Sequence, residues 1–263
     1  MMIDGLGVFV LLITGFVAGA LGGLLGIGGC VIIMPVIRFG FHFSPTLMVG
    51  TSLTAVVFTS ASGAWNNWRI RNVDNNTTLT FAISGVIGII VGSIVFSSIA
   101  HYGPLIDLII GLAFLWPALR MLNEGIFPQK GKEVIGKVIP GSMMAKSIIG
   151  SSVGFLTGVT GLCGGYALVP LSVYVLKSNM KIAIGTSLAS FLWFALLGAG
   201  IKYYEGFVDI FAAIVLGIAA AIGAVYGVKL MQKLNISVLK LIFGVIITYV
   251  SIKYMLLYFG IRI

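Results

Sequence analysis

Charged residues are scarce in this sequence. Only 9% of its 263 residues are Asp, Glu, Lys or Arg, whereas 59% are hydrophobic, and the mean hydropathy is +1.14. A soluble domain carries about 25% charged residues, so this chain cannot cover a water-soluble globule with polar side chains. The same composition excludes a disordered chain. A polytopic helical membrane protein remains, because the apolar runs are long and continuous instead of alternating as in barrel strands.

Cysteine and catalytic signatures are also scarce. The two cysteines, Cys30 and Cys163, cannot form a disulfide framework, and without a nearby histidine they predict no metal site. No nucleophile–base pair, phosphate-binding loop or dinucleotide fingerprint occurs, so we expect neither an enzyme nor a cofactor. The segment MMIDGLG lacks a positive region and predicts no removable signal peptide. The net charge of +9 forms no basic cluster interleaved with aromatics, so we expect no nucleic-acid partner.

Apolar segments long enough to cross a bilayer recur along the chain. The expected full spans are 6–25, 45–65, 77–99, 104–122, 143–161, 182–201, 208–230 and 238–257. Two short apolar pieces, 30–37 and 166–176, each follow a glycine cluster, and WNNW at 65–68 is interpreted as an interfacial anchor. We expect a first membrane repeat over 1–122, a polar linker over 123–140 and a second repeat over 141–263, together one membrane domain.

The two halves repeat each other at an offset of 135 residues, without a gap until the last span. Gly50-Thr51-Ser52-Leu53 falls on Gly185-Thr186-Ser187-Leu188, and Val73-Asp74 falls on Val208-Asp209. Apolar composition alone would not keep polar residues and glycines in register, so the chain is a tandem duplication. The glycines at four-residue spacing, which is typical of close helix packing, are Gly15, Gly19, Gly23, Gly88, Gly92, Gly150, Gly154, Gly158, Gly223 and Gly227.

The distribution of positive charge favours inverted halves. If each glycine-broken pair returns the chain to its starting side, Arg38, Lys202, Lys253 and Arg262 lie on one side. The other twelve are Arg69, Arg71, Arg120, Lys130, Lys132, Lys137, Lys146, Lys177, Lys181, Lys229, Lys233 and Lys240. If each pair were instead one broken span, the positive charges would divide ten against six. Lys and Arg concentrate in cytoplasmic loops, so the division of twelve against four is favoured.

The predicted fold is therefore an all-α polytopic membrane protein of two inverted repeats. Each repeat has a glycine-broken re-entrant or short helix pair plus three full transmembrane helices. The linker is expected to be cytoplasmic, and both termini are expected outside.

The glycine clusters at 26–29 and 161–165 predict a binding site. Consecutive glycines interrupt a helix, and glycine-interrupted segments at matching positions of two repeats mark the sites of secondary transporters. The short helix after each break offers N–H groups and partial positive charge, which hold an anion without Lys or Arg. The predicted substrate-binding residues are Gly26, Gly28, Gly29, Cys30, Thr51, Ser52, Gly161, Cys163, Gly164, Gly165, Thr186 and Ser187.

Several residues keep two interpretations. Cys30 and Cys163 are either small apolar fillers or thiols that contact a sulfur-containing substrate. Asp74 and Asp209, at equivalent positions, are either helix N-caps or binding residues for a coupling proton or Na⁺. Asp107 lies inside an expected span, and it is a third coupling candidate or a charge in the first helical turn.

The pattern G-x-x-G-x-x-G-x-G-G-G-x-x-x-x-P, followed by G-T-S-L, occurs once per half and resembles the TauE/SafE sulfite exporter family, also called TSUP transporters. The first copy comprises Gly19, Gly22/Gly23, Gly26, Gly28, Gly29 and Pro35. The second copy comprises Gly154, Gly158, Gly161, Gly164, Gly165 and Pro170. Cys30 and Cys163 each replace one glycine of a triplet.

The resemblance implies a secondary-active transporter in a prokaryotic cell membrane. Its substrate would be a small sulfur-containing anion, sulfite or an organosulfonate such as sulfoacetate or a taurine derivative. An anion channel and a non-transporting membrane scaffold subunit remain the alternatives. The expected partners are the substrate and the lipid bilayer, with a homodimer left open.

Overall fold

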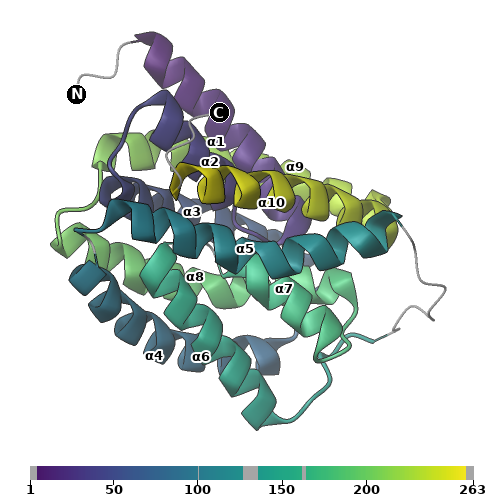
Figure 1. Ribbon diagram of the computed structural model, residues 1–263. Coiled ribbons are helices and arrows are strands. Elements are labelled where there is room, and N and C mark those ends of the chain that lie inside the picture. The colour runs from purple at the N-terminus through teal and green to yellow at the C-terminus, as the bar shows by residue number, and fades with distance from the viewer. Residues whose placement is uncertain (1–4, 100, 127–135, 162–163, 259–263) are drawn as a thin grey trace.

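The computed structural model describes residues 5–99, 101–126, 136–161 and 164–258, and these ranges form helices without strands (Figure 1). The elements are α1 (Gly5–Leu25), α2 (Cys30–Pro35), the π-helical turn η1 (Val36–Gly40), α3 (Pro45–Arg69), α4 (Asn75–Ile99), α5 (Gly103–Ile126), α6 (Met143–Thr160), α7 (Gly165–Tyr174), α8 (Met180–Tyr204), α9 (Ile210–Lys233) and α10 (Ile236–Tyr258). The predicted all-α class is confirmed.

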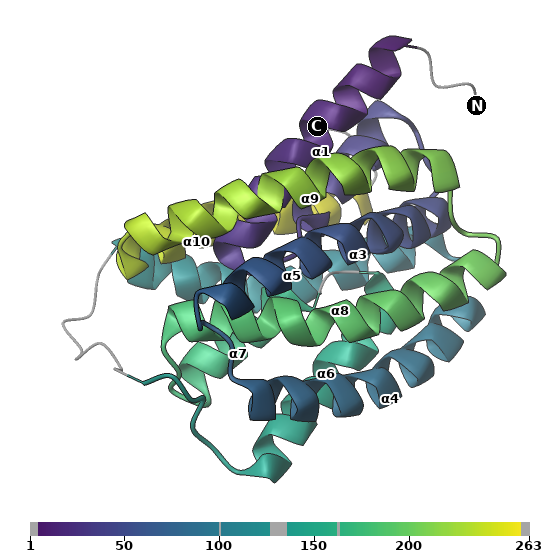
Figure 2. The same cartoon turned by 180° about the vertical axis from the view of Figure 1, so that it is seen from behind.

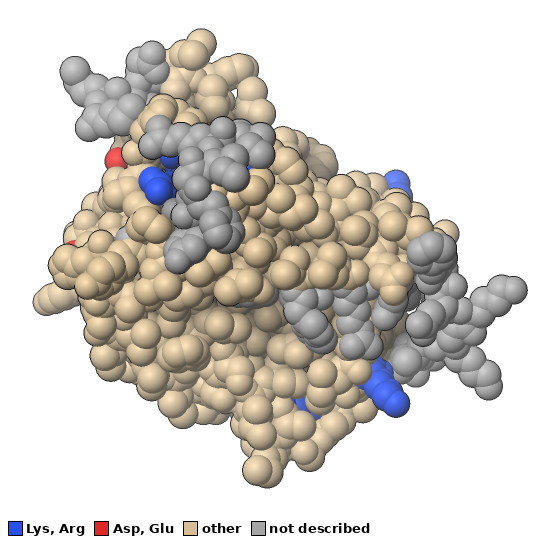
Figure 3. All heavy atoms as spheres, viewed as in Figure 1, with Lys and Arg blue, Asp and Glu red and all other residues tan. Residues whose placement is uncertain are grey.

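Within the described residues, six helices are long and apolar enough to cross a membrane: α1, α3, α4, α8, α9 and the Ser237–Leu256 part of α10. Their outer faces expose rows of large apolar side chains, such as Leu79, Ile83 and Ile87 at four-residue spacing on α4. On the face shown in Figure 3, the charged atoms of the described residues lie toward the periphery, with a broad uncharged area between them. Such a surface suits hydrocarbon better than water, and the protein is a multi-pass membrane protein.

Helix starts coincide with side-chain caps. The Ser44 hydroxyl accepts the Leu47 N–H before α3, and the Ser142 hydroxyl accepts the Ala145 N–H before α6. Asn179 caps α8 in the same way. Each cap satisfies a backbone donor that the first helical turn cannot satisfy. α5 continues to Ile126, four residues into the expected linker, of which 127–135 lie outside the described residues.

The two halves pack their helices against each other. α1 lies along α9, and the counterpart helix α6 lies along α4 (Figures 1 and 2). A Cβ added at Gly19 would lie 2.0 Å from the Ala220 carbonyl oxygen, and one added at Gly154 would lie 2.2 Å from the Gly85 carbonyl oxygen. The glycines therefore let the backbones of two helices touch, which confirms their predicted packing role.

The counterpart helices α4 and α9 run in opposite directions. Asp74 at the start of α4 is bonded to Thr186 near the start of α8, and Ser97 near the end of α4 is bonded to Glu205 just after α8. α4 and α8 are therefore parallel. α9 is antiparallel to both, because its last turn accepts a hydrogen bond from Lys181 at the start of α8. Since α9 is the counterpart of α4 in the repeat, one of them begins where the other ends.

Candidate substrate site

The first glycine break separates α1 from α2. Gly26, Gly28 and Gly29 have φ values of 75°, 72° and 95°, in the left-handed region that glycine adopts at little cost. A Cβ at Gly29 would also lie 2.6 Å from the Ala18 carbonyl oxygen of α1. All three glycines are buried. The chain therefore turns inside the protein, and α2 starts there.

The second break separates α6 from α7. Gly161, with φ of 66°, ends α6, and α7 begins at Gly165. A Cβ at Gly164 would lie 2.9 Å from the Phe191 ring of α8. The predicted site residue Cys163 lies outside the described residues. The described part of this break is buried, as is the first break.

The two breaks touch each other. A Cβ at Gly165 would lie 1.8 Å from the Gly26 carbonyl oxygen, so the backbones are in direct contact. Gly26 also lies against the Ile184 backbone of α8, and Gly161 lies against Val49 of α3. Ile184 and Val49 occupy the same position of the repeat. Each break therefore packs against the second long helix of the other half, which is α8 for the first break and α3 for the second.

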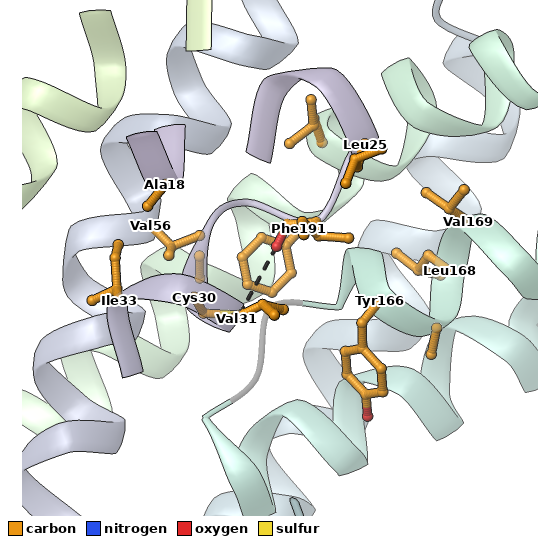
Figure 4. Packing of buried hydrophobic residues seen from close by; sticks show 14 of the residues in the cluster. Ala18, Leu25, Cys30, Val31, Ile33, Val56, Tyr166, Leu168, Val169 and Phe191 are labelled. Atoms are coloured by element: carbon orange, nitrogen blue, oxygen red, sulfur yellow. Dashed lines mark hydrogen bonds between the residues drawn. The ribbon is translucent and has the colours of Figure 1, made fainter. Parts of the chain in front are cut away.

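The first break lies within the apolar core. Figure 4 shows Cys30 and Val31 of α2, Phe191 of α8 and Tyr166 of α7 in one packed region. Cys30 is fully buried, and its Sγ atom lies 3.9 Å from the Ile27 carbonyl oxygen. Cys30 is disulfide-bonded. A disulfide sulfur is not a free thiol, whereas the burial of Cys30 in the apolar core agrees with its interpretation as a filler.

The Gly-Thr pairs of α3 and α8 hold the two halves together. A Cβ at Gly50 would lie 2.0 Å from the Phe207 carbonyl oxygen, and the Thr51 hydroxyl accepts the Asp209 N–H at 2.9 Å. The counterpart contacts are present too: Gly185 lies against the Asn72 carbonyl, and the Thr186 hydroxyl accepts the Asp74 N–H at 3.0 Å. Both threonine side chains are fully buried and anchor the loop before a helix of the other half.

The two predicted serines differ in what they bind. The Ser187 hydroxyl donates to the Gly26 carbonyl oxygen at 3.1 Å and so connects α8 to the first break. The Ser52 hydroxyl donates to the Val49 carbonyl oxygen of its own helix. Ser187 is therefore the predicted hydroxyl residue whose hydrogen bond reaches a break directly.

Asp74 caps α4 in a buried network. One carboxylate oxygen accepts the Thr77 N–H, and the other accepts the Thr77 hydroxyl at 2.7 Å and the Ile139 N–H at 2.8 Å. Lys146 donates to both the Thr77 hydroxyl and the Ile139 carbonyl. Burial alone would raise the pKa of Asp74, but these hydrogen bonds and the Lys146 charge hold it below its ordinary value of 3.8. The N-cap interpretation is confirmed.

Asp209 also caps its helix, with fewer partners. Its carboxylate accepts the Ala212 N–H at 2.9 Å, and the side chain is half-buried. The N-cap interpretation is confirmed here as well. Asp107 is the fifth residue of α5, just past the first turn, and its side chain is outside the described residues. Binding of a coupling ion at these aspartates stays a prediction.

Sequence reasoning missed a buried lysine. Lys202 belongs to the last turn of α8 and has no exposed surface, although the expected span ends at residue 201. The 135-residue offset places it on Asn67, which is also fully buried, so a polar residue recurs at this position. The interfacial interpretation therefore fails for Asn67, whereas Trp65 and Trp68 are exposed and stacked on each other.

Cavities also occur on the outer faces of the helices. A cavity of about 600 Å³ lies between α2, η1 and α10, with Val31 and Tyr249 in its wall and Lys253 beside them. Within the described ranges, no three His, Cys, Asp or Glu side chains lie close enough to hold a metal ion. The candidate site is thus the buried contact between the two breaks.

Together, the fold and this site define a polytopic helical membrane protein whose two repeats bring their glycine breaks into contact. The chain matches the family "Sulfite exporter TauE/SafE" over residues 11–254, and it belongs to this family of membrane transporters.

Relatives of similar length carry transporter names. The chain is 24% identical to "Probable membrane transporter protein YunE" of Bacillus subtilis, with 96% of this chain and 98% of the relative covered. It is 28% identical to "Probable membrane transporter protein MJ0441" of Methanocaldococcus jannaschii, with 86% and 87% covered. It is 26% identical to YdhB of Bacillus subtilis, which has the same description, with 88% and 93% covered. No solved structure matches the chain.

Proposed function

We propose that this protein is a secondary-active transporter of a small sulfur-containing anion in a prokaryotic cell membrane. The substrate is sulfite or an organosulfonate such as sulfoacetate or a taurine derivative. The observation that carries the proposal is the buried contact between the two breaks, where Gly165 lies against the Gly26 carbonyl. Paired glycine-broken segments are where secondary transporters bind their substrates. The family name supports a sulfur oxyanion.

Backbone groups provide the binding chemistry in this proposal. α2 begins after Gly29 and α7 begins after Gly164, so two helix N-termini lie close to the contact between the breaks. Helix N-termini carry N–H donors and partial positive charge, and glycine lets an anion approach the backbone closely. An anion held by dipoles leaves without breaking an ion pair, which suits reversible transport.

The proposed mechanism is alternating access by inverted repeats. The opposite directions of the counterparts α4 and α9 support the inversion, as do the exchanged Thr–Asp contacts between the halves. Rocking of one half against the other would open the site to each side in turn. The excess of Lys and Arg on the linker side supports a cytoplasmic linker and external termini.

The transport proposal is tested by flux into proteoliposomes. The panel is sulfite, sulfoacetate, taurine, sulfate and bicarbonate, with and without a proton or Na⁺ gradient. We expect saturable flux and counterflow for sulfite or a sulfonate. Zero flux for every anion, in protein shown to be folded, contradicts the proposal. Unitary currents would identify a channel instead.

The orientation is tested with a pair of variants that each introduce one exposed cysteine. Lys137 is exposed on the linker side, and Tyr204 is 94% exposed at the opposite end of α8. In intact cells, a membrane-impermeant thiol reagent should label Tyr204→Cys and leave Lys137→Cys unlabelled. The reverse pattern overturns the orientation and leaves the transport proposal intact.

A further inference from the structure

Lys202 is a buried cation at the end of α8. Its ammonium nitrogen lies 2.9 Å from a Glu205 carboxylate oxygen and 3.7 Å from the centre of the Phe96 ring. Within the ranges that the structure describes, it is the one Lys or Arg in the buried class. An ammonium removed from water is costly unless an anion pairs with it. An anion beside the Lys202 ammonium offsets this cost, and Glu205 is that anion here.

Glu205 is the more exchangeable member of this ion pair. Its side chain is 23% exposed, whereas that of Lys202 is fully buried. Glu205 lies just beyond the end of α8, before Gly206 with φ of 76°, so it belongs to a turn. Its second carboxylate oxygen accepts the Ser97 hydroxyl at 2.5 Å. A free anion arriving from this end could replace the Glu205 carboxylate without leaving the ammonium unpaired.

The ion pair lies on a contact between the two halves. The Lys202 carbonyl accepts the Phe207 N–H at 2.9 Å, and the Phe207 carbonyl lies against Gly50 of α3. A Cβ at Gly50 would lie 3.2 Å from the Lys202 Cβ. Asn67 occupies the equivalent place beside Gly185. A buried cation is thus present at one of the two equivalent contacts, and an uncharged amide at the other.

We propose that Lys202 is an anion-binding residue on the path between the breaks and the end of the protein opposite the linker. The Glu205 carboxylate pairs with the Lys202 ammonium when the path is closed. A small oxyanion displaces the carboxylate during entry or exit. The Lys202–Glu205 pair is therefore an ionic gate. This inference rests on the proposed function, because it assigns a charged side chain to the path of the same anion.

Equilibrium binding to the purified full-length protein in detergent tests the gate. The probes are sodium sulfate and sulfoacetate, and the readout is the shift of the unfolding temperature with anion concentration. Glu205→Gln should bind the anion about tenfold more tightly, since it removes a tethered competitor that occupies the site most of the time. Ser97→Ala, which only loosens Glu205, should give a smaller increase. The Lys202→Gln/Glu205→Gln double variant should not show the increased anion affinity of Glu205→Gln.

A matched control is Lys253→Gln, because Lys253 also lies over an aromatic ring, 4.4 Å from the centre of Phe39. Its anion affinity should equal that of the wild type. Equal affinities of wild type and Glu205→Gln overturn the inference, as does tight binding by the Lys202→Gln/Glu205→Gln double variant. If that double variant does not fold, Lys202→Arg/Glu205→Gln keeps the charge and should bind as tightly as Glu205→Gln; wild-type affinity in it overturns the inference.

The gate and the transport proposal fail separately. Wild-type flux that saturates, together with anion binding independent of Lys202, removes the gate and leaves the transport function. Anion binding that depends on Lys202, in a protein without flux for any anion, removes the transport function and leaves the anion site.

Discussion

The Thr186–Asp74 and Thr51–Asp209 contacts are equivalent positions of the repeat, yet their surroundings differ. In both, a threonine hydroxyl of one half accepts the N–H of an aspartate in the other, beside a glycine that admits a backbone carbonyl. The Asp74 contact is buried and continues into Thr77, Ile139 and Lys146. Asp209 is half-buried. Among the described side-chain contacts, its carboxylate makes the cap of α9 and does not continue into a network.

The comparison shows that the two halves share their backbone contacts but differ in the charged groups around them. Backbone contacts recur because the two halves share the same backbone geometry. The charged groups differ: Asp74 lies in a closed network, whereas the Asp209 end of the molecule contains the Lys202–Glu205 pair. In the proposed mechanism, the Asp74 contact stays closed and the Asp209 contact opens.

The largest effect is expected at the part the two contacts share. Gly50→Ala places a Cβ 2.0 Å from the Phe207 carbonyl oxygen, and Gly185→Ala places one 2.2 Å from the Asn72 carbonyl oxygen. Overpacking against backbone should lower the free energy of unfolding by about 3 kcal/mol in each variant. Thermal unfolding in detergent measures it, with Gly200→Ala as control, because nothing lies within 4 Å of that added Cβ. A tolerated Gly185→Ala would contradict the equivalence.

The aspartates should separate the two contacts. Asp74→Asn weakens hydrogen bonds to a buried carboxylate and should cost about 2 kcal/mol. Asp209→Asn should cost well under about 1 kcal/mol, since asparagine is an equally good N-cap. Chemical unfolding of both variants beside the wild type measures this. Equal losses would mean that the Asp74 network adds nothing to the cap.

Acid should act through Asp74. Its pKa in the folded protein lies below 3.8, so the folded state favours the ionised form. The resulting stabilisation is present above about pH 4 and is lost as the pH falls through the folded-state pKa. The unfolding temperature of the wild type should therefore fall below about pH 4 more steeply than that of Asp74→Asn. A wild-type slope in Asp74→Asn would refute this assignment.

The threonines should show smaller effects than the two glycines and Asp74. Thr186→Val and Thr51→Val remove the hydroxyl that accepts an aspartate N–H. Each should cost about 1 kcal/mol, with the larger loss at Thr186 because the Asp74 N–H is buried away from water. Unfolding temperatures of the two variants rank them. A larger loss for Thr51→Val would reverse the proposed difference between the contacts.

The helical repeat and its packing glycines could be predicted from the sequence. Gly19 and Gly154 keep their register in both halves because each admits a backbone carbonyl of a neighbouring helix. Close packing of two helices requires glycine at fixed spacing, so this pattern can be recognised in the amino-acid sequence. The first break was visible for a related reason, since three left-handed residues within four positions favour glycine.

The partners of the motif residues could not be predicted. Nothing local in Gly50-Thr51 shows that it binds the loop before α9. That contact joins Thr51 to Asp209, which lies 158 residues later in the other half. Lys202 was missed because hydropathy ends the span just before it, whereas the structure extends α8 to Tyr204 and buries the charge against Phe96. Its alignment with Asn67 was the available signal.

Counterflow in proteoliposomes with two serine variants of α8 tests most directly whether the contact between the breaks is the transport site. Ser187 donates to the Gly26 carbonyl of the first break, whereas the equally buried Ser190 donates to the Thr186 carbonyl of α8 and the Thr78 carbonyl of α4, neither of which belongs to a break. We predict that Ser187→Ala lowers sulfite or sulfoacetate counterflow about tenfold, the effect of one lost hydrogen bond. Ser190→Ala should keep the wild-type rate. Equal counterflow in the two folded variants would contradict the account.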